Sequence, residues 1–291
     1  MFTTSEFERI NDEFKKELKT LSTKNKRIWG ILFFATTVLI VLLIIIFPNQ
    51  FKNEEVSWIL PVYGGMAFLL TLIGFLISLN YISEKPFFTV LFEKIYRKIN
   101  LDEGIFLEYK SYDKDNIGYN KTGGLFTKWS RVINRRHISG NTENQHKFDV
   151  FDCVMVTSSG KNKRVHFDGT YLILHKKPNT IVQFRSGGSP KLKNIKFSKI
   201  ENEYGFKIYK ELDKELSSTD LTLQRYYEKL ISLKGIKRVY LGTTENEIHI
   251  ALAYRKYPAR KKKNVTIQTC NDYLSYFKSE LAMIDEIDNL Y

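Results

Sequence analysis

The chain has 291 residues, a formal net charge of +13 and two cysteines. That length allows one domain of ordinary size beside smaller segments, and the wide separation of Cys153 and Cys270 excludes a disulfide scaffold or a cysteine-based metal knuckle. The basic excess falls mostly after residue 82, and it indicates attraction to anionic lipid or a lysine-rich residue usage rather than nucleic-acid binding.

Residues 1–27 have the pattern of an amphipathic helix. Ser5 and Glu8 have the spacing of a capping box, and apolar residues recur at three- and four-residue steps from Phe7 to Leu21. The repeat is too short for a coiled coil, so we expect this helix to pack against the rest of the protein.

Two uncharged stretches follow, at residues 28–47 and 58–82. At about 1.5 Å rise per residue, each helix would cross a hydrocarbon core about 30 Å thick. The short polar link between them predicts a transmembrane hairpin over residues 28–82. A signal peptide fits less well because the first stretch follows a long charged segment and has no small-residue cleavage site. A pair of buried core helices of this length is improbable in one modest domain.

Basic residues flank the outer ends of the predicted hairpin. Lys26 and Arg27 precede it and Lys85 and Lys94 follow it, whereas the link contains only Lys52. The positive-inside rule therefore predicts a two-span, multi-pass protein of the cell membrane with both termini in the cytoplasm. Neither stretch carries a charge, so we interpret the hairpin as an anchor rather than a pore made by oligomers. Small residues predict helix packing or self-association: Gly64, Gly65, Gly74 and Ser78.

The chain after the hairpin divides into a juxtamembrane helix, residues 83–100, and a cytoplasmic α+β domain, residues 101–291. In that domain, a period of two between turn residues predicts strands, and a period of three to four predicts helices at 219–234 and 272–290. The fold class is therefore α+β: a two-helix transmembrane hairpin plus a β-rich cytoplasmic domain with C-terminal helices. The expected strands are 105–112, 124–133, 150–158, 164–175, 180–185, 195–200, 206–209, 238–241 and 247–254.

Four segments resemble an uncharacterised bacterial family of two-span membrane proteins, classified only as a domain of unknown function. They are GGLFTKW at 123–129, HFDGTYLILHKKPNTIVQF at 166–184, ENEYGFKIYKELDKELSSTDLTLQRYYEKLISL at 201–233 and ENEIHIALA at 245–253. The resemblance covers much of residues 85–291 and implies the N-terminal hairpin with a cytoplasmic α+β domain. It also suggests company with small membrane proteins of the LemA type, and it brings no catalytic residues.

Three short motifs resemble ligand sites. Residues 113–118 begin like a calcium loop, but Gly124 stands where the acidic twelfth residue belongs. Residues 159–161 end like a phosphate loop but lack the required earlier glycine. His166 and Asp168 could form a dyad on one strand face, although a half-exposed strand edge explains them more simply. We therefore expect no enzyme, no catalytic residues, no metal site and no cofactor.

Basic clusters are the stronger non-catalytic feature. Near a membrane surface they indicate contacts with lipid headgroups or other anions, and solvated loops are an equally good explanation. The segment Ser186-Gly-Gly-Ser189 could form a backbone nest for an anion, with a flexible loop as the simpler interpretation. The candidate contacts are Lys161, Lys163, Arg164, Lys176, Lys177, Lys191, Lys193, Arg260, Lys261, Lys262 and Lys263.

Two functions are consistent with these patterns. The first is a membrane-anchored cytoplasmic adaptor or scaffold that binds anionic inner-leaflet lipid or a protein partner, such as a second copy or another small membrane protein. The alternative is a membrane-tethered sensor or effector whose β-rich domain binds an anionic small molecule. An enzyme is the third and least favoured hypothesis, because no pattern in the sequence indicates a reaction.

Overall fold

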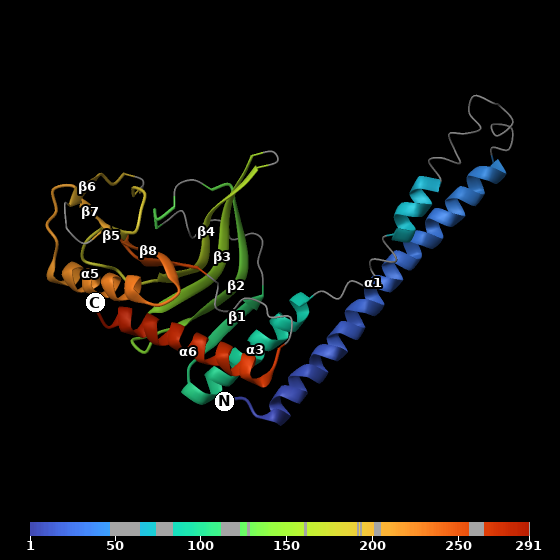
Figure 1. Cartoon of the computed structure of the whole chain (residues 1–291), viewed down its shortest axis with the longest axis horizontal. Coiled ribbons are helices and arrows are strands. Elements are labelled where there is room, and N and C mark those ends of the chain that lie inside the picture. Colours follow the sequence, from blue (N-terminus) through green and yellow to red (C-terminus); the bar gives the residue numbers. More distant parts are fainter. Residues whose placement is uncertain are drawn as a thin grey trace. The chain divides into compact units, whose positions relative to one another are not determined.

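A computed structural model covers the whole chain (Figure 1). It describes residues 1–46, 65–73, 84–111, 123–126, 129–159, 162–190, 192, 194–200, 205–255 and 265–290. These residues form two compact units: an N-terminal unit, Thr3–Leu91, and a second unit, the β domain, made of Met1–Phe2 and Phe92–Tyr291.

The N-terminal unit is dominated by one long helix, α1 (Thr4–Ile46). Its first half carries charges that pair along the helix, as between Lys15 and Asp12. A helix over residues 65–73 packs against its second half, where the rings of Phe33 and Phe68 lie 5.0 Å apart. The second half also exposes large apolar side chains: Ile28, Ile31, Leu32, Phe34, Val38, Leu39, Val41 and Leu42.

The predicted transmembrane hairpin is wrong. Across the described parts of the chain, no helix is both long and apolar enough to cross a membrane. Residues 28–46 continue the charged helix α1, so they do not form a separate apolar element. The described part of the second stretch, 65–73, would reach only about 14 Å at 1.5 Å per residue.

Three predictions that depended on the hairpin are corrected with it. These are the transmembrane part of the fold class, the two-span location with cytoplasmic termini, and the integral membrane partnership. Of the predicted helix-packing residues, Gly64, Gly74 and Ser78 lie outside the described residues. Gly65 is exposed, and a Cβ added there would meet no atom within 4 Å.

The β domain is built on a nine-stranded antiparallel sheet of order β1-β2-β3-β4-β9-β8-β5-β7-β6 (Figure 1). Alternating side chains and turn residues explain the strands locally. The strands are β1 (Leu107–Ser111), β2 (Arg131–Asn141), β3 (Lys147–Ser159), β4 (Asn162–Leu174), β5 (Val182–Arg185), β6 (Phe197–Ile200), β7 (Lys207–Glu211), β8 (Ile236–Thr243) and β9 (Ile248–Tyr254).

The hairpin of β8 and β9 lies between β4 and β5, although it follows both in sequence. Strand β4 approaches β9 closely at Gly169, where an added Cβ would lie 1.9 Å from the carbonyl oxygen of Leu252. Only glycine fits this position. On the other side of the hairpin, Arg185 of β5 is paired with Tyr240 of β8, which positions the site described below.

Three helices complete the described part of the β domain: the C-terminal part of α3 (Glu84–Glu103), α5 (Ser218–Ser232) and α6 (Ile267–Asp288). Figure 1 shows α5 and α6 together on one side of the sheet. A capping box between Ser217 and Asp220 begins α5, because each satisfies a backbone N–H of the other.

A buried ionic cluster joins α6 to the sheet. Arg136 of β2 is fully buried, and its guanidinium contacts the carboxylates of Asp152 and Glu280 and the hydroxyl of Tyr96. Both oxygens of Glu280 accept from Arg136 Nη2 at 2.8 Å. Burial raises the pKa of the Glu280 carboxyl, against the opposing charge of Arg136. The charges are therefore paired where the helix covers the sheet.

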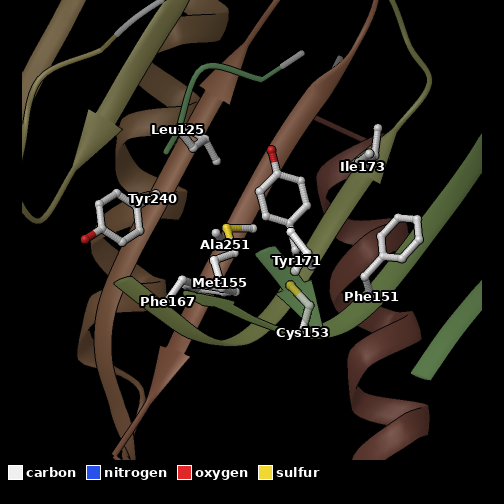
Figure 2. Close-up of a cluster of buried hydrophobic side chains, with 10 residues drawn as sticks. Leu125, Phe151, Cys153, Met155, Phe167, Tyr171, Ile173, Tyr240 and Ala251 are labelled. Atoms are coloured by element: carbon white, nitrogen blue, oxygen red, sulfur yellow. The ribbon is translucent and has the colours of Figure 1, made fainter. Parts of the chain in front are cut away.

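A cluster of buried hydrophobic side chains is formed by residues of β2, β3, β4, β8 and β9 together with Leu125 (Figure 2). Figure 2 shows Leu125 and Tyr240 at one end of this cluster and Phe151 and Ile173 at the other. The segment that contains Leu125 was expected to be a strand over 124–133, but β2 begins only at Arg131. Gly124 adopts φ +60°, a left-handed conformation that is incompatible with regular strand geometry at that residue.

Candidate functional site

A cavity of about 360 Å³ opens at the end of β5, beside the Leu125 end of the hydrophobic cluster. Four parts of the chain line it: the segment before β2, strand β4, the end of β5 with its following loop, and β8. The lining residues are Leu125, Phe126, His166, Arg185, Ser186, Gly187, Gly188, Ser189, Arg238 and Tyr240.

Strand pairing explains why the two arginines meet here. Arg185 lies opposite Tyr240 in the β5–β8 ladder, so both side chains lie on one face of the sheet. Arg238 is two residues before Tyr240 on β8, and a strand directs such residues to the same face. The N–H of Ser186 donates to the carbonyl of Val239 at 3.0 Å, which extends this pairing into the loop.

Arg185 is 3% exposed and is one of the residues that line the cavity. Its guanidinium donates to Gln183 Oε1 at 2.6 Å, to the Leu125 carbonyl at 2.7 Å, to the Gly187 carbonyl at 3.3 Å and to the Gly124 carbonyl at 3.5 Å. All four acceptors are neutral. In the described chain no Asp or Glu pairs with it, and burial lowers the pKa of Arg185.

The loop Ser186–Ser189 closes one side of the cavity. Gly188 has φ +77°, a conformation that other residues rarely adopt. Its carbonyl accepts from the Tyr209 hydroxyl at 3.2 Å, and Ser186 Oγ donates to the Val239 carbonyl at 3.0 Å. Among the described residues, no acceptor receives the N–H groups of Gly187, Gly188 or Ser189. The loop is therefore held in shape while its amides stay available.

The rest of the lining adds positive charge and apolar surface. Arg238 is exposed at the rim, and His166 is half-buried with its Nε2 atom 2.7 Å from Thr157 Oγ1. No carboxylate is among the described lining residues. A cavity with this lining can attract and hold an anion, because an unopposed buried charge and free backbone N–H groups both favour negative ligands.

A second polar feature runs along the sheet at the Phe151 end of the cluster, and we call it the histidine chain. His175 is at its centre, with Nε2 2.8 Å from Asp149 and Nδ1 3.0 Å from Glu247. Asp149 also contacts His137 at 2.7 Å, and Glu247 contacts His249 at 3.0 Å. Within the described residues no group of side chains is arranged to hold a metal ion.

The partners of the histidine chain shift their pKa values in opposite directions. Hydrogen bonds to Asp149 and Glu247 raise the pKa of His175 to about 9. Burial alone would raise the pKa of Asp149, but hydrogen bonds from His137 and His175 lower it well below its usual range. Hydrogen bonds from His175 and His249 likewise lower the pKa of Glu247. His175 is therefore a cation held between two carboxylates at neutral pH.

Each of the predicted lipid or anion contacts lies either away from the cavity or outside the described residues. Lys176 donates to the carboxylate of Asp288 at 2.9 Å, so it holds the end of α6. Arg164 and Lys177 are exposed, and neither lines the cavity. Lys163 lies on β4, but its side chain is outside the described part. The others, also outside it, are Lys161, Lys191, Lys193, Arg260, Lys261, Lys262 and Lys263.

The suggested dyad of His166 and Asp168 does not form. Asp168 pairs with Arg135 at 2.8 Å, whereas His166 contacts Thr157. The loop at 186–189 was predicted as a candidate anion site, whereas Arg185 and Arg238 were not predicted to be part of one. One signal was present, because an arginine that directly precedes Ser-Gly-Gly-Ser places a cation beside a loop rich in free N–H groups.

A larger cavity of about 630 Å³ lies near the end of α6. Its lining is acidic, with Glu103, Glu143, Asp285 and Glu286 beside one lysine, Lys278. The lysine already pairs with one of these carboxylates, and the backbone N–H of a second lining residue donates to another. No described group in this cavity points to a ligand.

Comparison with known proteins gives little further guidance. No protein-family model and no curated protein matches the chain. A crystal structure of the mycobacterial trehalose monomycolate transport factor A, TtfA, is similar at a TM-score of 0.31 and 11% identity, covering 64% of this chain and 93% of that one. A likeness at this level carries no conclusion about fold or function.

Proposed function

We propose that the β domain is a binding module for a small anionic ligand, which occupies the cavity beside Arg185. The observation that carries the proposal is the buried guanidinium of Arg185, which has neutral acceptors and no carboxylate partner among the described residues. This is the anion-binding part of the sensor hypothesis, without the membrane tether.

A purely structural role accounts for only part of this arrangement. Arg185 does tie the segment around Leu125 to the loop at Gly187, and four carbonyl-type acceptors satisfy most of its N–H groups. Hydrogen bonds to neutral groups leave the positive charge itself uncompensated. A buried charge without a counter-charge costs several kcal/mol. An anion in the adjacent cavity would offset that cost, which supports binding there.

The loop and the rim supply the direct contacts. Most N–H groups of Arg185 are already used, so its main contribution is positive electrostatic potential in the cavity that it lines. The unused N–H groups of the loop Ser186–Ser189 and the side chain of exposed Arg238 are available to an oxyanion. Ligand affinity should therefore depend on Arg238 without loss of the fold.

Titration of the full-length chain with inorganic phosphate, at ionic strength held constant with chloride, tests the proposal. We expect a saturable rise in melting temperature, since a ligand that binds only the folded state stabilises it. Arg238→Gln should weaken binding about fivefold to tenfold, because it removes one charge-assisted contact. Arg225→Gln is the matched control, since Arg225 is an exposed arginine on α5 that does not line the cavity.

Two results would contradict the proposal. The first is a melting temperature that stays unchanged up to tens of millimolar phosphate. The second is an equal loss of binding in Arg238→Gln and Arg225→Gln. The second result would mean that the overall positive charge of +13 attracts the anion without a site. The adaptor role remains a prediction that no described feature tests.

A further inference from the structure

We infer that the ligand of this cavity is an organic anion with a flat apolar or aromatic body, rather than a bare inorganic oxyanion. The inference rests on the proposed function and assigns the class of ligand. It follows from the size of the cavity and from the division of its lining into a cationic part and an aromatic part.

The size of the cavity is the first argument. Its volume of about 360 Å³ falls in the range of clefts that hold small organic molecules, about 300–1,000 Å³. A single phosphate or sulfate group would fill only part of this space. The apolar residues around the unfilled part would stay in contact with water. Binding of a larger ligand would remove that contact, which is favourable.

The aromatic wall is the second argument. Phe126 and Tyr240 line the cavity together with Leu125, in addition to the polar loop. The ring of Phe126 packs against the rings of Phe167 and Tyr240, at centroid distances of 4.9 Å in both cases. Phe126 is nevertheless only half-buried. A supported ring with exposed surface beside a charged site offers a rigid face on which a flat ligand can stack.

Charge and shape together define the class. The anionic group, a carboxylate or a phosphate monoester, would lie near the loop and Arg238. The charge of Arg185 would add positive electrostatic potential there. The ring of the ligand would lie on Phe126, near the half-buried ring of His166. No described carboxylate lines the cavity to recognise an amine, so a zwitterion gains nothing over a simple anion.

Calorimetric titration of the full-length chain with two probes, inorganic phosphate and phenyl phosphate, tests the inference. We expect phenyl phosphate to bind about tenfold more tightly, the equivalent of one good aromatic contact. Phe126→Leu should reduce that ratio to about threefold or less. Leucine keeps an apolar side chain of similar size but removes the ring.

Each outcome has a separate meaning. Equal affinities for the two probes overturn the inference about the ligand class and leave the anion site in place. An unchanged ratio in Phe126→Leu overturns it as well, because the preference would then arise elsewhere. Binding of neither probe contradicts the proposed function itself. Benzoate against acetate repeats the comparison for carboxylates, where tighter binding of benzoate supports the inference and equal affinities contradict it.

Discussion

Replacing Arg136 by methionine should destabilise the β domain strongly, because two buried carboxylates would lose their cation. Asp152 and Glu280 are almost fully buried and both contact the Arg136 guanidinium. Removing one partner of a buried ion pair costs about 3–5 kcal/mol, since it leaves an uncompensated charge. Methionine has a similar length and stays apolar, so little of this cost would come from a cavity.

The neighbouring residue provides a matched control. Arg135 lies on the same strand and pairs with Asp168 at 2.8 Å, but both side chains are well exposed. Exposed ion pairs contribute about 0–1 kcal/mol. Arg135→Met should therefore shift the urea midpoint of the full-length chain only slightly, whereas Arg136→Met should move it by several times as much at the same slope.

The pH dependence separates charge from packing. Burial already raises the pKa of Glu280, and losing Arg136 would raise it further. A carboxyl with a raised pKa favours folding in its protonated form, so the penalty of Arg136→Met should shrink as the pH falls through that pKa. Adding Glu280→Gln should recover part of the loss at neutral pH. A penalty as small as that of Arg135→Met, or one independent of pH, would refute the electrostatic account.

Three further substitutions test other parts of the β domain. His175→Gln should cost about 1–2 kcal/mol at pH 6.5 and progressively less as the pH rises through about 9, because the raised pKa of His175 stabilises the fold only while the ring is charged. Gly169→Ala should cost about 3 kcal/mol in urea unfolding, because the new Cβ meets the Leu252 carbonyl. Ser217→Ala should cost about 1 kcal/mol, seen as a lower melting temperature, because it removes the cap of α5.

Each of these has its own control or contrary result. Gly140→Ala is a milder comparison, because its Cβ would first meet the flexible side chain of Leu107 at 2.7 Å. Equal costs for the two glycine variants would argue against a backbone conflict at Gly169. For His175→Gln, a difference from wild type that is the same at pH 6.5 and pH 9.5 would show that the imidazolium does not stabilise the fold. An unchanged melting temperature in Ser217→Ala would show that the cap of α5 does not contribute to stability.

The strands were predictable where their signals are local. Strands were expected at 150–158, 164–175 and 180–185, and β3, β4 and β5 lie there. Alternating side chains and flanking turn residues are properties of a few consecutive residues. The insertion of β8 and β9 between β4 and β5 is not such a property, because it depends on pairing between distant segments. The neighbours of Arg185 therefore could not be predicted.

The error in the N-terminal unit has a different origin. The absence of charge in residues 28–47 and 58–82 is a property of composition. The prediction of two separate membrane helices was based on that property. Helix propensity does not change sharply between residue 27 and residue 28, so α1 runs through that boundary as one helix with a charged half and an apolar half. Of the second stretch, the described helix covers 65–73 alone. Hydropathy does not show where a helix begins and ends.

The two buried arginines of the β domain provide the strongest argument about the site. Both are charged residues on strands, and sequence alone would place both at the surface. Arg136 is covered by α6 and receives two carboxylates, so its charge is compensated within the protein. Among the described residues, Arg185 meets only neutral acceptors, and of the two arginines it is the one that lines the cavity of about 360 Å³. Within the described residues, the β domain therefore supplies carboxylates to Arg136 and none to Arg185, and this contrast supports the proposal that an anionic ligand occupies the cavity beside Arg185.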